Sequence, residues 1–161
     1  MPKTNLKILT LAELTTRAEE IRANRRRLVL TNGCFDLLHV GHVRYLQQAA
    51  ELGDVLVVAV NGDESVRSLK GCGRPLNSEE DRAEVLAALE CVDFVVIFPE
   101  VRATRVIEAL RPAIYVKGGD YTLESLDPEE VAALKKAGAE IKTLPLIPEK
   151  STSRLIERMR D

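Results

Sequence analysis

Apolar residues follow two different patterns that alternate along the chain. Over Thr10–Asn24 they recur every three or four positions, which predicts an amphipathic helix. Val55–Val60 reads VLVVAV without a polar residue, and such a run is typical of a strand that is covered on both faces, as in a parallel sheet. The alternation continues through the rest of the sequence, so strands and helices are expected to follow one another.

Turn and cap residues fix where these elements begin and end. Gly53 and Pro112 mark the ends of two helices, and Ser78 is the expected N-cap of a third, with Asp81 at its third position. The predicted strands are 28–30, 55–60, 94–98, 113–117 and 140–144, and the predicted helices are 10–24, 41–52, one opening at 61–63, 78–89, 104–110, 128–137 and one from 151.

This order of elements predicts an α/β fold. Continuous apolar strands that alternate with helices are typical of a Rossmann-like, doubly wound parallel sheet, here with about five strands and flanking helices in a single domain. We place a lead-in helix within residues 1–26 and the sheet domain within residues 27–161.

Composition and charge narrow the class of protein. The 161 residues include 45% hydrophobic residues and carry a net charge of -2, so one domain can build a core. A slightly acidic chain lacks the broad basic face of a nucleic-acid binder, and the only basic cluster, Arg25–Arg27, fits a solvated helix end. No apolar run approaches the length of a membrane span, so we expect no membrane partner.

The cysteines and the N-terminus point to a compartment. Cys34, Cys72 and Cys91 are odd in number and show no C-x-x-C spacing, which argues against a disulfide framework or a zinc ribbon. The first residues contain no apolar signal core. A reducing, cytoplasmic location is the expectation.

Polar, Gly-rich and Lys-bearing segments follow most of the predicted strands. They lie at 32–42, 61–63, 117–121 and 150–154. In a doubly wound sheet, ligands bind at the carboxyl ends of the strands, so these segments are expected to converge on one site.

The first of these segments contains the only two histidines of the chain. His39 and His42 are three residues apart, with Gly41 between them, at the start of a predicted helix. The positive end of the helix dipole and its free N–H groups suit phosphate, and Gly41 allows a nucleotide to lie close to the backbone. This arrangement favours attack on the α-phosphorus of a nucleoside triphosphate, in which the protein orients the reactants and stabilises developing charge.

Two other interpretations of the histidine pair exist. A zinc site would need a further ligand at suitable spacing, and neither that nor an H-E-x-x-H motif is present. A purely structural pair at a helix start remains open, but the position directly after a strand favours the catalytic interpretation.

The segment TNGCFDLLHVGHVRYL at 31–46 resembles the signature of the cytidylyltransferase-like nucleotidyltransferases. Within that superfamily the chain is more similar to the adenylyltransferase domain of the bacterial enzymes that make ADP-heptose from heptose 1-phosphate. The segments RPLNSEEDR, VKGGDY and the terminal STSRLIERM carry this closer resemblance, which extends over nearly the whole chain from the first strand onward.

The resemblance implies roles for particular residues of this sequence. His39, His42 and Lys70 match catalytic residues that stabilise the transition state or contact phosphates. The second substrate is expected to contact Asn61, Asp63 and Arg82, and Asp36 is expected either to contact that substrate or to orient a cation. The nucleotide is expected to contact Asn32, Gly33, Cys34, Phe35, Gly41, Lys117, Gly118, Asp120, Ser151, Thr152 and Ser153.

Several of these residues also fit a plainer interpretation. Lys70 could equally be a solvated lysine in a loop. The segment Lys117–Asp120 could equally be a Gly-rich turn. Ser151–Ser153 taken alone indicates a helix N-cap. Asp63 could equally be the N-cap residue of its helix, and Arg82 could equally be an exposed arginine on a helix surface.

The implied reaction is transfer of AMP from ATP to D-glycero-β-D-manno-heptose 1-phosphate, which gives ADP-heptose and pyrophosphate. A cytidylyltransferase acting on glycerol 3-phosphate is the alternative that the same signature allows, and a non-catalytic nucleotide sensor is a third, which the presence of both histidines disfavours. Magnesium is implied with ATP, because the charge of the triphosphate must be neutralised. The resemblance also implies a homodimer and, since this chain is too short to hold a fused sugar kinase, a separate kinase upstream.

Overall fold

The computed structural model describes residues 3–119, 122–145 and 151–160, in which strands alternate with helices. The strands are β1 (Leu28–Gly33), β2 (Val55–Asn61), β3 (Phe94–Phe98), β4 (Ile114–Gly118) and β5 (Glu140–Leu144). The α-helices are α1 (Leu11–Ala23), α2 (Val40–Ala50), α3 (Asp63–Lys70), α4 (Glu79–Ala87), α5 (Thr104–Leu110), α6 (Pro128–Ala137) and α7 (Thr152–Arg160), and two short 3₁₀ helices are η1 (Lys3–Leu6) and η2 (Leu123–Ser125).

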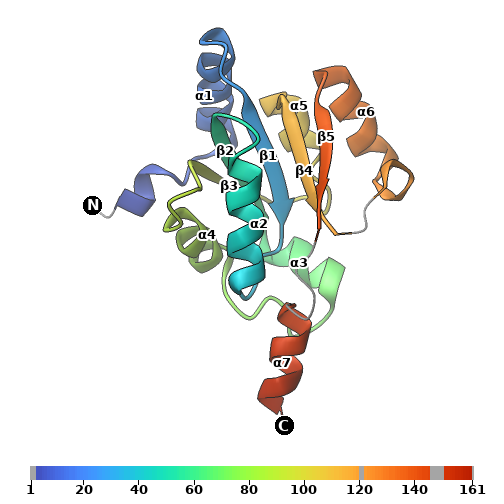
Figure 1. Cartoon of the computed structure of the whole chain (residues 1–161). Helices are drawn as coiled ribbons and strands as arrows, with labels where there is room; N and C mark the ends of the chain where they lie inside the picture. Colours follow the sequence, from blue (N-terminus) through green and yellow to red (C-terminus); the bar gives the residue numbers. More distant parts are fainter. Residues whose placement is uncertain (1–2, 120–121, 146–150, 161) are drawn as a thin grey trace.

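The strands form one parallel five-stranded sheet in the order β3-β2-β1-β4-β5 (Figure 1). The central strand is β1, and its residue Leu30 lies opposite Val57 of β2 and Tyr115 of β4. The chain winds outward from β1 to one edge and then to the other, which confirms the predicted doubly wound fold. The strand order reverses beside β1, and this is the place where such sheets bind ligands.

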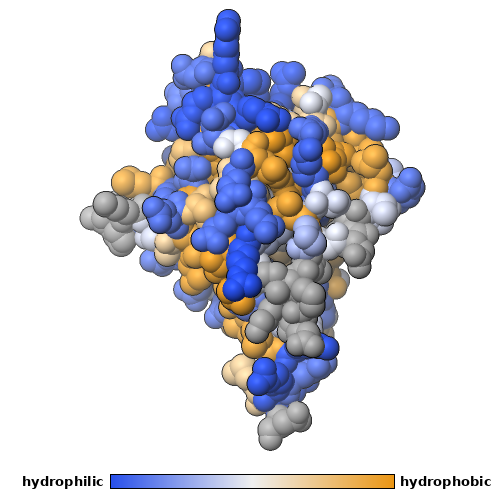
Figure 2. All heavy atoms as spheres, in the orientation of Figure 1, coloured by the Kyte–Doolittle hydropathy of each residue, from blue (hydrophilic) through white to orange (hydrophobic). Residues whose placement is uncertain are grey.

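Helices cover both faces of the sheet. Buried side chains of α1, α5 and α6 pack against one face, and those of α2 and α4 pack against the other. Leu14 of α1 and Leu46 of α2 are both completely buried, so each helix directs its apolar stripe inward as its periodicity predicts. In the orientation of Figure 1, Figure 2 shows a hydrophilic surface over α2, where Arg44 and Gln47 are exposed.

Most predicted boundaries are confirmed, because local signals set them. Thr10 caps α1, and the Ser78 side chain accepts a hydrogen bond from the Asp81 N–H at the start of α4. The prediction that β1 ends before Thr31 was wrong: it runs on to Gly33, because pairing with β2 continues to that residue. The 3₁₀ helices η1 and η2 were not predicted, since so short a segment has no periodicity to detect.

The lead-in helix α1 is an integral part of the sheet's cover. Leu14, Ala18 and Ile21 are buried in the same core cluster as strands β1 and β2. The domain boundary that we placed at residue 27 stays a prediction. In the part of the chain that the structure describes, no helix is both long enough and apolar enough to cross a bilayer.

Candidate active site

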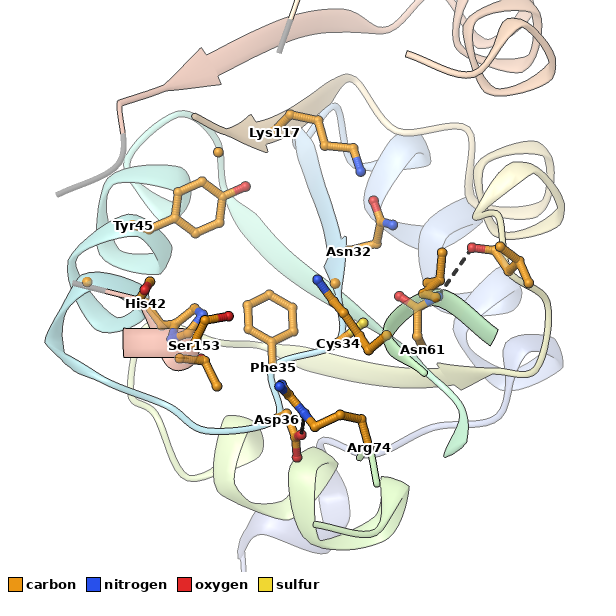
Figure 3. A pocket seen from close by; sticks show the side chains of 18 of the residues that line it. Asn32, Cys34, Phe35, Asp36, His42, Tyr45, Asn61, Arg74, Lys117 and Ser153 are labelled. Atoms are coloured by element: carbon orange, nitrogen blue, oxygen red, sulfur yellow. Dashed lines mark hydrogen bonds and ion pairs between the residues drawn. The ribbon is translucent and has the colours of Figure 1, made fainter. Parts of the chain in front are cut away.

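A polar cavity of about 680 Å³ lies at the carboxyl ends of β1, β2 and β4 (Figure 3). The cavity lies at the edge of the sheet where the sequence predicted a ligand site, and segments that lie far apart in the chain line it. The predicted residues that line it are Asn32, Gly33, Cys34, Phe35, Asp36, His39, Gly41, His42, Asn61, Lys70, Lys117, Gly118, Ser151, Thr152 and Ser153. Asp63 and Arg82 do not line this cavity, and Asp120 lies outside the described residues.

The two histidines cap α2 in a reciprocal arrangement. His39 is the N-cap residue, and its Nδ1 accepts the Gly41 N–H at 3.0 Å. The Nδ1 atom of His42 accepts the His39 N–H at 3.3 Å, and the ring centroids are 4.0 Å apart. Because each Nδ1 is an acceptor, a neutral ring carries its proton on Nε2. The backbone therefore fixes the tautomer of both imidazoles, with the proton on Nε2.

The half-buried position of His42 keeps its ring neutral. Burial lowers the pKa of His42 to about 4, and the neighbouring His39 ring acts in the same direction. Phe35 contributes to this environment, since its ring meets the His42 ring edge-on at a centroid distance of 5.6 Å. At neutral pH His42 is a hydrogen-bond donor without net charge.

Acidification is expected to destabilise the protein through His42. The unfolded chain protonates this residue near pH 6.5, whereas the folded protein does so near pH 4. The unfolded state thus binds more protons in this window, and stability is lost as the pH falls from 6.5 through 4. After allowance for solvent that reaches the ring, the loss is roughly 1–3 kcal/mol. Urea unfolding across this pH window measures it, and His42→Gln should show a shallower slope; equal slopes would contradict the assignment.

Gly33 and Phe35 shape the loop between β1 and α2. A Cβ atom at Gly33 would lie 3.0 Å from Cε2 of the Phe35 ring, so a side chain at this position would require the ring to shift by a few tenths of an ångström. Phe35 itself has a φ of 48°, which is rare for a bulky residue. A backbone held in such a conformation is common at functional sites and here places the ring against His42.

Asp36 anchors a loop that comes from far along the chain. Its carboxylate accepts hydrogen bonds from the backbone N–H groups of Leu76 and Asn77 and from Nε of Arg74. The Asn77 amide also donates to the Asp36 carbonyl oxygen. Burial acts to raise the pKa of Asp36, but these hydrogen bonds outweigh it and lower the pKa, so the carboxylate stays charged. The predicted substrate contact of Asp36 stays a prediction, and its observed partners belong to this loop.

Arg82 forms hydrogen bonds to backbone carbonyl groups at the ends of β1 and β2. Its side chain is 1% exposed, so the interpretation of Arg82 as an exposed arginine was wrong. The guanidinium donates to the carbonyl oxygens of Cys34, Asn61 and Asn77 and pairs with Asp63 at 2.7 Å. The capping interpretation of Asp63 was also wrong, because Gly62 occupies the N-cap position of α3.

Buried partners orient the polar residues at the end of β1 and β4. The Tyr115 hydroxyl donates to Oδ1 of Asn32 at 2.5 Å, which directs the Asn32 amide group. Burial lowers the pKa of Lys117, whereas nearby Glu130 acts to raise it. Lys117 Nζ also lies 5.7 Å from the centre of the Tyr115 ring. These two strands thus present an amide and a lysine to the same cavity.

The start of α7 closes the cavity from another side. The Thr152 hydroxyl donates to the Leu37 carbonyl oxygen at 2.9 Å, which ties α7 to the loop after β1. The side chain of Ser151 accepts the Arg154 N–H, so the expected capping role is confirmed. Two helix starts, those of α2 and α7, therefore border one cavity.

The thiol of Cys34 shows no sign of activation. Burial raises the pKa of Cys34, and nearby Lys70, Arg82 and Arg74 only partly oppose this effect. The three cysteines are all free. Cys34 thus lines the cavity as a small neutral side chain.

Several residues of the cavity were not predicted: Tyr45, Leu69, Arg74, Val101, Arg102, Ser125, Leu126, Asp127, Glu130 and Pro145. Val101 and Arg102 follow β3, so the rule applied to the other strands would have found them. Asn61 reaches this loop, because its Nδ2 donates to the Val101 carbonyl oxygen at 3.3 Å. Arg74 and Glu130 gave no local signal, since their place in the site depends on contacts distant in sequence.

The donor set does not form a metal cage. Within the described residues, no group of three or more His, Cys, Asp or Glu side chains could hold a metal ion. The carboxylate of Asp36 is engaged by its loop, and Glu130 accepts the Ala103 N–H through Oε1.

Relatives of known sequence match 83% to 99% of this chain but are longer than it. Proteins named bifunctional protein HldE are 50% identical over 159 residues in Geotalea uraniireducens (99% of this chain, 32% of the relative) and 52% identical over 134 residues in Citrifermentans bemidjiense (83% and 27%). The one from Koribacter versatilis is 48% identical over 159 residues (98% and 32%). The chain spans about a third of the length of the relatives it matches.

Solved structures and the sequence model of a protein family are also similar to this chain. The lipopolysaccharide core biosynthesis protein of Thermoplasma volcanium superposes with a TM-score of 0.63 at 28% identity, over 78% of this chain and 99% of that one. Pantoate-beta-alanine ligase from Francisella tularensis shares the fold alone, with a TM-score of 0.57 at 13% identity over 91% and 68% of the two chains. The sequence model of the cytidylyltransferase-like family matches residues 30–158. The chain belongs to the cytidylyltransferase-like family.

Proposed function

We propose that the protein is a nucleotidyltransferase that transfers AMP from ATP to D-glycero-β-D-manno-heptose 1-phosphate. The observation that carries this proposal is the pair His39 and His42 at the start of α2, which presents two imidazole donors to a cavity lined by lysines. Membership of the cytidylyltransferase-like family supports the same chemistry.

The reaction follows from the charges that the cavity can stabilise. A phosphate oxygen of the sugar phosphate attacks the α-phosphorus of ATP, a new O–P bond forms, and the bond to the pyrophosphate oxygen breaks. The nucleophile is already an anion, so no general base is needed. His39, His42 and Lys70 act by donating hydrogen bonds to phosphoryl oxygens whose charge grows as the leaving group departs.

The other predicted residues are assigned to one of the two substrates according to their place in the cavity. Asn32 and Lys117 at the ends of β1 and β4, together with Ser151–Ser153 at α7, would hold the nucleotide and its phosphates. Asn61 at the carboxyl end of β2 and Asp36 in the loop after β1 also line the cavity, and the resemblance assigns both to the second substrate. Magnesium would enter with ATP and neutralise part of its charge.

The proposed identity of the sugar substrate is based on the similarity to the relatives. The HldE proteins match this chain along nearly its full length at about 50% identity, and the chain resembles the adenylyltransferase domain of ADP-heptose synthesis. The related Thermoplasma volcanium structure carries a name from lipopolysaccharide core biosynthesis. We therefore propose ADP-heptose as the product, in the cytoplasm, with the 1-phosphate supplied by a sugar kinase reaction. A homodimer is proposed on the same resemblance and is tested by the mass of the protein in solution.

Pyrophosphate release tests the proposal. The purified protein with magnesium should release pyrophosphate with ATP and heptose 1-phosphate, and much less with CTP and glycerol 3-phosphate. Preference for the second pair would retain the chemistry but replace the substrates. If no pair gave release from a folded protein that binds ATP, the catalytic proposal would fail and a sensor role would take its place.

A further inference from the structure

Arg74 is a cavity residue that the proposed reaction has not yet used. It comes from the loop between α3 and α4, and its side chain is 21% exposed. Figure 3 shows it reaching from this loop toward Asp36 and Phe35. It lines the same cavity as both histidines and Lys70.

Only the Nε side of the Arg74 guanidinium is hydrogen-bonded within the described residues. Its Nε donates to Oδ2 of Asp36 at 2.7 Å, and the Asp36 side chain is 1% exposed. The same carboxylate accepts the N–H groups of Leu76 and Asn77, which fixes the loop as well as the side chain. Within the described residues, neither terminal nitrogen of Arg74 has a hydrogen-bond partner.

An arginine oriented in this way is suited to a phosphoryl group. Its two terminal nitrogens form a planar fork that matches two oxygens of a phosphate. The Asp36 carboxylate fixes the orientation before a ligand arrives, so less side-chain entropy is lost on binding. Arg74 also lines the cavity, which a purely structural ion pair would not require.

We propose that Arg74 binds a phosphoryl group of one of the two substrates and that Asp36 is the positioning residue that orients it. The inference rests on the proposed function for the nature of the ligands, but not on turnover. The phosphoryl group comes either from ATP or from the sugar phosphate, and binding measurements distinguish the two.

Calorimetric titration of Arg74→Gln with ATP, inorganic pyrophosphate, heptose 1-phosphate and adenosine tests the proposal. We expect the affinity for the phosphate that Arg74 contacts to fall roughly 10- to 100-fold, with adenosine unaffected. Loss for ATP and pyrophosphate assigns Arg74 to the triphosphate, and loss for heptose 1-phosphate alone assigns it to the sugar phosphate. Arg67→Gln is the matched control, because Arg67 is exposed, pairs with Glu64 and does not line the cavity.

Asp36 is tested in the same assay. Asp36→Asn should weaken the same ligand, and in the Arg74→Gln background it should add little, because the two residues act as one unit. Arg74→Lys should restore part of the affinity, since it keeps the charge but not the fork. Thermal unfolding of each variant confirms that it is folded.

Unchanged affinity for every phosphate ligand in Arg74→Gln, or an equal loss for adenosine, would overturn the proposal. Additive effects of the two substitutions would overturn the positioning role of Asp36. None of these outcomes depends on catalysis: a protein that failed to release pyrophosphate with any sugar phosphate could still show the phosphate-specific loss for ATP.

Discussion

Replacing His42 with alanine is expected to lower kcat about 10²- to 10³-fold while the protein remains folded. In the proposed reaction the substitution removes an Nε2–H donor to the phosphates, in a partly buried site where such a donor stabilises developing charge most strongly. The substitution removes the interaction that grows in the transition state, so kcat should fall more than the affinity for ATP. Steady-state pyrophosphate release and ATP titration together measure this difference.

His39 allows the catalytic and the capping roles to be separated. Its side chain caps α2 by accepting the Gly41 N–H, and asparagine is among the residues preferred at an N-cap position. His39→Asn should therefore retain the unfolding free energy to within about 1 kcal/mol and still lose about 10²-fold in kcat. A His39→Asn protein with normal kcat would show that the ring serves only as a helix cap.

Replacing Arg82 with methionine is expected to cost about 3–5 kcal/mol of unfolding free energy. The guanidinium is buried, and its removal leaves the carbonyl oxygens of Cys34 and Asn61 without the donor that now satisfies them, and Asp63 without its partner. For a chain of this size, that lowers Tm by roughly 6–20 °C. Methionine has a similar length and no charge, so the effect reports the lost hydrogen bonds rather than a cavity.

Arg105→Met provides the matched control for Arg82. Arg105 also pairs with an acidic residue, Glu100, but its side chain is 71% exposed. An exposed pair contributes about 0–1 kcal/mol, so this variant should unfold almost as the unaltered protein does. Equal Tm values for the two variants would show that Arg82 does not hold the strand ends together.

Features that depend on residues close to one another in the sequence were predicted well. The bounds of β3, α5, α6 and β5 agree with the sequence pattern, because apolar periodicity and cap residues act within one element. The histidine pair was found for the same reason: its geometry depends on a helix start and on residues only three positions apart.

Residues whose environment depends on distant segments were missed or misjudged. Arg82 lies on a helix that begins with three acidic residues, where an exposed position is the natural expectation. Its burial results from carbonyl oxygens that converge from the ends of β1 and β2 and from the loop before α4. Arg74 entered the site only because Asp36, which lies 38 positions earlier, holds its loop.

The sequence by itself determined the order of strands and helices, the doubly wound sheet and the place of the loop after β1 at the cavity, because these depend on local periodicity and on which strand ends share an edge. The tertiary structure alone decided which charges are buried and which side chains from distant segments line the cavity. Those properties depend on hydrogen bonds and solvent exclusion between segments that meet only when the sheet and its loops are assembled.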